Sequence, residues 1–478
     1  MLVSPSSLGA ITEIESGLHW DAATLARQVR RRVAVLSQYN VGRGTRVAIA
    51  HGGTAHFFAD LLAMWRIGAM AACLDPALTA SELANVIAFT KPAVILTAGK
   101  PIETGAAPIL DLANAAAPSD LVQSAPAPEP RDAALVLFTS GTTGMPKGVV
   151  LSFGALEARI TANIAAIGGG TLQRTLVTLP THFGHGLIGN ALTPLFAGGT
   201  ILLPPISMAL AANLGSLVDL YRIGFMSSVP ALWRMALKLS APPKTDSLQR
   251  VHIGSAPLSA TLWSDVAAWA RCETVNCYGM TETANWFAGA SSRIGVADGL
   301  VGAPWEGVGA VRDAKGKIMA NGEGEIVAQS CALMAGYLDR PDLTAEVMKG
   351  GWYHTGDWGR IDEYGRIWLI GRIKDEINRA GVKVQPAEVD RLLETHPAVA
   401  EACAFGVPDS ISGESIAVAV KLNPGIDSNV ESLRAWCRER MRHEAVPEQW
   451  FIIDEIPRTA RGKVGRDAVR RILTRDKP

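Results

Sequence analysis

The segment FTSGTTGMPKG, residues 138–148, has the residue types of a phosphate-binding loop. Hydroxyl groups and flexible backbone amides can wrap phosphate oxygens, and Lys147 adds a point positive charge. A polar turn of glycine and threonine without any ligand is the alternative interpretation. The candidate phosphate-binding residues are Thr139, Ser140, Gly141, Thr142, Thr143 and Gly144.

The loop does not match the Walker A pattern, the commonest sequence of a phosphate cradle. That pattern ends in Gly-Lys-Ser/Thr, whereas Gly148 follows Lys147 here. The flanking segments ALVLF and GVVLS are apolar, so we expect a loop between two strands instead of a strand-to-helix turn. The spacing therefore argues against the usual P-loop site.

Four further motifs follow the loop in order: NCYGMTE at 276–282, GWYHTGD at 351–357, GRIKDEINRAGVKVQPAEVD at 371–390 and PRTARGKVGR at 457–466. Together with the loop they resemble the acyl-adenylate-forming (AMP-binding) ligases, the family of acyl-CoA and aryl-CoA synthetases. The resemblance covers most of the chain. It implies activation of a carboxylic acid by ATP as acyl-AMP, with release of pyrophosphate, and then transfer to a thiol.

The resemblance assigns a nucleotide site whose residue types suit their roles. Tyr278 offers an aromatic face for adenine, and Asp357 can accept from both ribose hydroxyls. Half-buried packing of the tyrosine and a turn-forming aspartate are the alternatives. The expected ATP- and AMP-binding residues are the loop positions 139–144 together with Asn276, Tyr278, Gly279, Met280, Thr281, Asp357 and Arg372.

The same resemblance implies the catalytic residues Lys147, Glu282 and Lys463. Glu282 is the expected ligand of Mg²⁺ on the ATP phosphates, and Lys463 is expected to neutralise charge near the α-phosphate. Taken alone, Glu282 reads as a surface acid and Lys463 as part of a solvated tail. Lys374 matches the hinge position of the family, and Gly381 matches the tunnel for the pantetheine thiol of CoA.

The segment from Pro180 to Leu203 overlaps the acyl-pocket region of the family. Relatives that activate amino acids usually carry an aspartate here, so we expect an aryl or fatty acid instead of an α-amino acid. His182 and His185 are spaced as H-x-x-H, but without an apparent third ligand a wall or gate role is favoured over a metal site. The expected acyl-pocket residues are His182, Phe183, Gly254, Ser255, Ala256, Cys277 and Trp286.

Alternating apolar strands and helical stretches through about residue 300 predict an α/β fold with parallel or mixed sheets and crossover helices. One helix is expected after Asp21 as its cap, and another over 187–196. Segments around Asn321-Gly322 and Tyr364-Gly365 predict a small antiparallel β subdomain. We expect an N-terminal domain at 1–373 and a small, mobile α+β lid at 374–478.

The composition restricts the partners of the chain. Its 478 residues include 45 Lys and Arg and 45 Asp and Glu, so the formal net charge is zero. A zero net charge does not favour binding to nucleic acid or to anionic membranes. The sequence shows no uncharged membrane span and no targeting signal, so a cytoplasmic location is expected. The six cysteines form no CxxC pair, which favours buried side chains over zinc or disulfides.

Three other activities stay open at this point. A ligase that loads an acyl-carrier protein presents the same motifs, because a carrier protein offers the same pantetheine thiol as CoA. A kinase or other NTPase would release ADP instead of AMP and pyrophosphate. A nucleotide-binding regulator without catalysis would not need Glu282 and Lys463. The expected co-substrates are therefore ATP with Mg²⁺, a small carboxylic acid, and CoA or a carrier protein.

Overall fold

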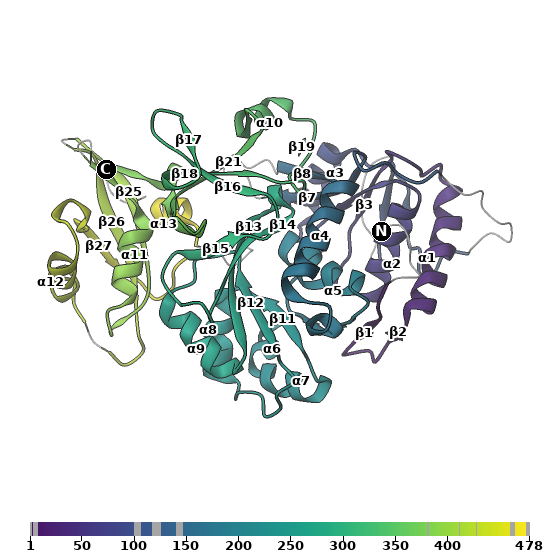
Figure 1. Ribbon diagram of the computed structural model, residues 1–478, viewed down its shortest axis with the longest axis horizontal. Helices are drawn as coiled ribbons and strands as arrows, with labels where there is room; N and C mark the ends of the chain where they lie inside the picture. Colours follow the sequence, from purple (N-terminus) through teal and green to yellow (C-terminus); the bar gives the residue numbers. More distant parts are fainter. Residues whose placement is uncertain are drawn as a thin grey trace. The chain divides into compact units, whose positions relative to one another are not determined.

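The computed structural model describes residues 2, 8–99, 107–116, 126–139, 147–379, 382–410, 412–426, 428–458 and 464–474 (Figure 1). Two compact units contain these residues. The first unit consists of Met1–Val308 and Ala328–Tyr353, and the second of Gly309–Val327 and His354–Pro478. Each unit is mixed α/β, which confirms the predicted fold class. The domain boundary near Lys374 and the mobility of the C-terminal part stay predictions.

One sheet of the first unit carries the two strands that flank the phosphate loop. Its order is β19-β8-β7-β4-β3-β5-β6. β7 is parallel to β4 and antiparallel to β8, so the loop joins two paired strands, as its apolar flanks predict. The strands are β3 (Arg46–Ile49), β4 (Met70–Cys73), β5 (Val94–Leu96), β6 (Ile109–Leu110), β7 (Ala133–Thr139), β8 (Lys147–Ser152) and β19 (Gly336–Tyr337).

The other sheet of the first unit runs in the order β15-β14-β13-β12-β11-β9-β10-β1-β2. Strands β13, β12, β11, β9, β10 and β1 are parallel to their neighbours in this order, so their carboxyl ends share one edge. The strands are β1 (Ile11–Glu13), β2 (His19–Trp20), β9 (Arg174–Val177), β10 (Thr200–Leu203), β11 (Phe225–Ser228), β12 (Arg250–Gly254), β13 (Glu273–Met280), β14 (Asn285–Ser291) and β15 (Leu300–Pro304).

The crossover helices of the first unit cover these sheets. Asp21 caps α1 as predicted, because its side chain accepts a hydrogen bond from the Thr24 amide at 2.7 Å. α1 packs on α2, and α2 packs on β3 and β4. The helices are α1 (Ala22–Ser37), α2 (Ala55–Arg66), α3 (Ala80–Thr90), α4 (Phe153–Ile167), α5 (Thr193–Phe196), α6 (Met208–Ala212), α7 (Leu214–Tyr221), α8 (Pro230–Leu239), α9 (Ala260–Ala270) and α10 (Pro341–Val347).

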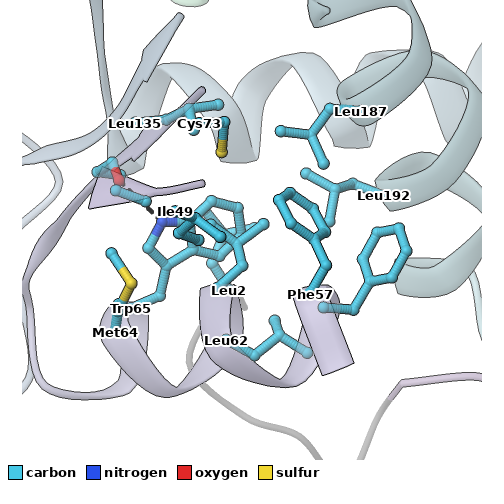
Figure 2. Close-up of a cluster of buried hydrophobic side chains, with 14 of the residues drawn as sticks. Leu2, Ile49, Phe57, Leu62, Met64, Trp65, Cys73, Leu135, Leu187 and Leu192 are labelled. Carbon is cyan, nitrogen blue, oxygen red and sulfur yellow. Dashed lines mark hydrogen bonds between the residues drawn. The ribbon is translucent and has the colours of Figure 1, made fainter. Parts of the chain in front are cut away.

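The core of the first unit is apolar and continuous between these helices and strands. α2 is buried along nearly its whole length, and Figure 2 shows Phe57 of this helix facing Leu187 and Leu192, with Trp65 beside Ile49. The Trp65 indole donates to the carbonyl of Ala134 at 2.8 Å, which satisfies its single polar group. The core thus fixes β7 next to the segment that follows β9.

The helix predicted over 187–196 begins earlier and has a different geometry. Residues His185–Leu192 form a π-helix, and α5 continues it. A Cβ atom at Gly189 would lie 2.1 Å from Asn285 Nδ2 and 2.8 Å from the Trp286 ring. The glycine therefore permits close approach of β14, and the wider π-helix is a form that is frequent at functional sites.

The second unit contains an antiparallel part in the order β17-β16-β18-β21-β22. The Tyr364-Gly365 turn joins a hairpin as predicted, since Ile361 pairs with Ile367. The strands around Asn321-Gly322 are not hairpin partners, because β17 pairs with β16, which lies between β17 and β18. The strands are β16 (Val308–Arg312), β17 (Ile318–Met319), β18 (Gly322–Gln329), β21 (Trp352–Ile361) and β22 (Ile367–Arg372). The short strand β20 (Met348–Lys349) belongs to the first unit.

The rest of the second unit is α+β, as predicted. A sheet in the order β24-β23-β26-β25, with β27 beside β26, packs against α11 and α13. Its elements are β23 (Ile377–Arg379), β24 (Val382–Val384), α11 (Pro386–Glu394), β25 (Val399–Asp409), β26 (Gly413–Leu422), α12 (Val430–Arg440), β27 (Gln449–Ile452) and α13 (Arg466–Thr474). Among the described residues, no helix is long and apolar enough to cross a membrane.

Candidate active site

The carboxyl ends of parallel strands collect most of the predicted site residues of the first unit. β9 leads to His182 and Phe183, β12 ends at Gly254 and leads to Ser255, and β13 ends at Met280 before Glu282. Strands β9, β11, β12 and β13 are neighbours in this order. Ligands of open α/β sheets bind outside the carboxyl ends of the strands, so we call this place the carboxyl edge.

The phosphate loop begins and ends on a paired residue of β7 and β8. Thr139 stands opposite Lys147 in the antiparallel ladder, and its hydroxyl donates to the Lys147 carbonyl at 3.5 Å. The loop is thus closed at its base by the sheet. The predicted phosphate ligands Ser140, Gly141, Thr142, Thr143 and Gly144 lie outside the described residues.

Tyr337 connects two of the predicted catalytic residues. Its hydroxyl donates to Glu282 Oε1 at 2.9 Å, and the Lys147 ammonium lies 5.3 Å from the centre of its ring. The residue is 8% exposed and belongs to β19, which pairs with β8 directly after the loop. Burial, and secondarily the Glu282 carboxylate, raises the pKa of the Tyr337 phenol, so the phenol stays a proton donor.

A buried arginine holds the turn that carries Glu282. Arg159 of α4 is fully buried, and its Nε donates to the Thr283 carbonyl at 3.1 Å. Its guanidinium also lies 3.7 Å from the Glu306 carboxylate. Desolvation lowers the pKa of Arg159 to about 10, which leaves the side chain charged at neutral pH. Arg159 therefore holds the backbone of the residue after Glu282, and Tyr337 holds the Glu282 carboxylate.

Sequence reasoning did not find Tyr337 or Arg159. Neither residue lies in a motif with recognisable spacing, and Tyr337 is separated from Glu282 by 55 residues. The Gly-Tyr pair at 336–337 follows Ser330, Cys331 and other unremarkable residues. The pairing of β19 with β8, and the hydrogen bond from the Met334 amide to the Glu282 carbonyl at 2.8 Å, bring this tyrosine to the site.

The predicted adenine segment is a bulged hairpin between β13 and β14. Tyr278 is buried at 7% exposure, and the side chain of Asn276 donates to the Leu300 carbonyl at 2.8 Å. A Cβ atom at Gly279 would lie 1.9 Å from the Asn285 carbonyl oxygen, so only glycine fits there. The Met280 amide donates to the Thr283 hydroxyl at 3.1 Å, which shapes the Thr281 turn.

The predicted acyl-pocket residues fall into two groups. His182 approaches the Asp75 carboxylate at 3.3 Å and stacks edge-on against Phe183. The predicted Ser255 contacts His185, a residue outside the predicted pocket set, at 2.8 Å between its hydroxyl oxygen and Nδ1. Gly254 lies against Cys277, because a Cβ atom there would lie 2.9 Å from the Cys277 carbonyl oxygen. Ala256 follows Ser255 on the same turn.

Trp286 belongs to a buried aromatic cluster below this turn. Its ring contacts His252 at 4.6 Å, His185 at 5.3 Å and Trp305 at 5.9 Å between centroids. Trp286 is 2% exposed. Complete burial lowers the pKa of His252 well below its usual value, so its imidazole is neutral and packs as an aromatic ring.

In the second unit, Asp357 and Arg372 form a close ion pair. They stand opposite each other on β21 and β22, with Arg372 Nε 2.6 Å from Asp357 Oδ1. Lys374 lies in the short 3₁₀ turn Ile373–Asp375 that follows β22. The strand register thus brings the predicted ribose residues together and places the predicted hinge residue directly after them.

Lys463 and Gly381 lie outside the described residues. The chain on both sides of Lys463 is anchored to the second unit by ion pairs. Arg458 contacts the Glu401 carboxylate at 2.5 Å, and Arg466 contacts Asp390 at 2.5 Å. These two pairs fix the ends of the segment that carries the predicted lysine.

The described residues contain no group of three or more His, Cys, Asp or Glu side chains that could hold a metal ion. Mg²⁺ does not need such a group, because it commonly binds one or two carboxylates together with substrate phosphates. Glu282 at the carboxyl edge fits that mode. All six cysteines are free, and four of them are buried.

The fold and these residues define the class of protein: an α/β protein in which the predicted phosphate loop connects the paired strands β7 and β8, and the predicted adenine motif lies at the carboxyl edge of a parallel sheet. The family model described as "AMP-binding enzyme" matches residues 10–338, and the one described as "AMP-binding enzyme C-terminal domain" matches residues 388–463. The chain belongs to this family of acyl-adenylate-forming ligases.

Individual relatives are similar over nearly the whole chain. The probable CoA ligase CCL9 of Humulus lupulus is 31% identical and covers 95% of this chain and 92% of its own. The fatty acid–[acyl-carrier-protein] ligase ScoC of Streptomyces coeruleorubidus is 30% identical, with 93% and 90% covered. The structure resembles ATP-bound MatB of Rhodopseudomonas palustris, with a TM-score of 0.87, 25% identity and 99% and 97% covered.

Proposed function

We propose that this chain converts a carboxylic acid and ATP into acyl-AMP and pyrophosphate, and then transfers the acyl group to the thiol of CoA. Family membership supports the reaction class. The observation that carries the proposal is the contact of Tyr337 with both Lys147 and Glu282. It joins the base of the phosphate loop to the candidate metal carboxylate.

In the first half-reaction the carboxylate oxygen attacks the α-phosphorus, and the bond to the leaving pyrophosphate breaks. Both reactants are anions, so the protein must offset their repulsion while it aligns them. Lys147 supplies positive charge at the loop, and Glu282 would hold Mg²⁺, which supplies charge neutralisation on the phosphates when bound. Lys463 remains the predicted lysine of this step, and Asp357 and Arg372 the predicted ribose contacts.

In the second half-reaction the thiol sulfur attacks the acyl carbonyl, loses its proton, and the bond to AMP breaks. No nucleophilic side chain is needed, because the mixed anhydride is already activated. CoA is the proposed acceptor, since the relative CCL9 is named a CoA ligase. A carrier protein is the second candidate, because the relative ScoC is named a ligase for an acyl-carrier protein.

The proposed acid carries no α-amino group. Amino-acid-activating relatives usually carry an aspartate after a phenylalanine in this segment, whereas Gly184 follows Phe183 here. His182 is already close to Asp75, so that carboxylate has a neighbour within the protein. We propose that an aryl or other organic acid occupies the carboxyl edge beside Ser255.

The test is pyrophosphate release with benzoates, cinnamates and fatty acids, with CoA or a carrier protein as acceptor. We expect AMP and pyrophosphate in equal amounts and an acyl-CoA product for at least one acid. Product formation only with a carrier protein would select the second candidate. Release of ADP, or no thioester with either acceptor, would contradict the proposal.

A further inference from the structure

Three polar side chains form a chain of hydrogen bonds at the carboxyl edge. His185 contacts the Ser255 hydroxyl at 2.8 Å through Nδ1 and the Ser227 hydroxyl at 2.6 Å through Nε2. The Ser227 hydroxyl also donates to the His252 carbonyl at 3.3 Å. Ser227 and His185 are buried, whereas Ser255 is exposed. These hydrogen bonds therefore connect the core to one exposed hydroxyl group, that of Ser255.

The protons of this chain can be assigned from the contacts. The Ser227 proton is used toward the His252 carbonyl, so Ser227 Oγ accepts from His185 Nε2–H. In a neutral imidazole the other nitrogen, Nδ1, is then an acceptor, and Ser255 must donate to it. The opposite tautomer would make only two of the three hydrogen bonds. Buried polar groups favour the arrangement that satisfies all three.

Ser255 is held in place by its backbone conformation and by the residue before it. It follows β12 directly at the carboxyl edge, and its φ of +68° is a left-handed conformation that costs energy for a residue with a side chain. Gly254 before it packs tightly against Cys277, which fixes the turn. Backbone strain of this kind is frequent at ligand sites. The hydroxyl proton points to His185, so the oxygen of Ser255 presents only lone pairs outward.

We propose that Ser255 is a specificity-determining residue that selects an acyl group carrying a hydrogen-bond donor, such as a hydroxylated aryl or aliphatic acid. This inference rests on the proposed ligase function. A substrate hydroxyl can donate a hydrogen bond to Ser255 Oγ. An ether, a halogen or a second carboxylate at the same place has no proton to donate, so it forms no hydrogen bond with this oxygen. His185 and Ser227 are positioning residues, because they set the direction of the Ser255 proton.

The test compares kcat/KM for matched acids: the three hydroxybenzoates, their methoxy counterparts and unsubstituted benzoate, scored by pyrophosphate release. We expect one hydroxyl position to be preferred over its methoxy partner by about tenfold, the effect of one well-formed hydrogen bond. A ratio of two rate constants does not depend on the fraction of folded enzyme. It therefore separates a specificity role from a structural one.

Two variants remove the hydroxyl in different backbone contexts. Ser255→Ala keeps the left-handed strain, whereas Ser255→Gly relieves it, and we expect both to bring the hydroxy/methoxy ratio close to one. Ser227→Ala keeps Ser255 but removes the hydrogen-bond partner of His185 Nε2. Each tautomer of His185 then makes one hydrogen bond, to Ser255, so neither tautomer is favoured by the number of hydrogen bonds. The ratio should then fall and methoxy acids should gain. Ser16→Ala, an exposed serine that contacts Glu13, is the control and should leave the ratio unchanged.

The outcomes distinguish this inference from the proposed function. Thioester formation with no hydroxy/methoxy preference, or a preference that survives in both Ser255 variants, would overturn the role of Ser255 while keeping the ligase. The absence of acyl-AMP and thioester with every acid would remove the proposed function itself.

Discussion

At the scale of single residues, Tyr337 couples the phosphate loop to the candidate metal ligand. Its ring lies under the Lys147 ammonium, and its hydroxyl donates to Glu282. The attraction between a cation and an aromatic face is worth about 0.5–1 kcal/mol where solvent reaches it, and a hydrogen bond to a carboxylate about 1.5–3 kcal/mol. Removing the hydroxyl should therefore cost more than removing the ring contact.

Tyr337→Phe keeps the ring and removes the hydrogen bond to Glu282. We expect a fall of about tenfold in the rate of acyl-AMP formation and a higher Mg²⁺ concentration for half-maximal rate, because the carboxylate loses its orientation. The measurement is pyrophosphate release against Mg²⁺ concentration. Thioester formation from supplied acyl-AMP should change little.

Tyr364→Phe is the matched control, since Tyr364 is 72% exposed and contacts Arg366 in the second unit. It should leave the Mg²⁺ dependence unchanged. An unaltered Mg²⁺ curve and rate in Tyr337→Phe would show that the hydroxyl does not position Glu282.

At the scale of elements, the predicted lysine segment is clamped at its C-terminal end by the Arg466–Asp390 pair. Arg466 begins α13, Asp390 lies on α11, and Arg466 also donates to the Ala404 carbonyl of β25 at 2.6 Å. The Arg466 side chain thus connects two helices through its ion pair and a strand through its hydrogen bond. Desolvation raises the pKa of Asp390 even though Arg466 acts in the opposite direction.

Arg466→Leu should lower the free energy of unfolding by about 2 kcal/mol, because it leaves the mostly covered Asp390 carboxylate without its cation. Thermal and urea unfolding measure this loss. The pKa of Asp390 in the folded state should rise further above the unfolded value, so the folded protein binds a proton that the unfolded chain does not. The difference in free energy of unfolding between the unmodified protein and Arg466→Leu should therefore become smaller as the pH is lowered from about 7 to about 5.

Arg470→Leu on the same helix is the control, because its ion pair with Asp467 is exposed and should cost less than about 0.5 kcal/mol. The double variant Asp390→Leu, Arg466→Leu should recover part of the lost stability. If the Arg466→Leu protein were as stable as the Arg470→Leu protein, the Arg466–Asp390 ion pair would not stabilise the second unit.

At the scale of the whole molecule, the two half-reactions place different demands on the chain. The resemblance implies a rotation at the hinge position, which Lys374 matches, that exchanges the residues serving each step. Lys463→Ala should lower adenylation by roughly a hundredfold, because the charge that the lysine neutralises develops in that step. Thioester formation from supplied acyl-AMP should be largely retained. Equal loss in both assays would contradict a role confined to adenylation.

Most of the elements that could be predicted from the sequence are local patterns. The strands on both sides of the phosphate loop, the helix after Asp21, the hairpin at Tyr364-Gly365 and the α+β C-terminal part are local patterns of hydrophobicity and turn residues, and the structure contains them. The place of β18 beside β16 instead of β17 is set by the whole sheet, and the π-helix at His185–Leu192 packs against Asn285 and Trp286, about a hundred residues further along the chain. Local periodicity holds no information on those neighbours.

The sequence by itself determined the family, the α/β fold class and the identity of Lys147, Glu282 and Asp357 as candidate residues, because these depend on residue type and short spacing. Only the tertiary structure decided which groups support them. Strand pairing brings Tyr337 to Glu282, the packing of α4 brings Arg159 to the Thr283 carbonyl, and the fold brings His185 into contact with Ser255. Such contacts join residues far apart in the chain, so their geometry exists only after folding.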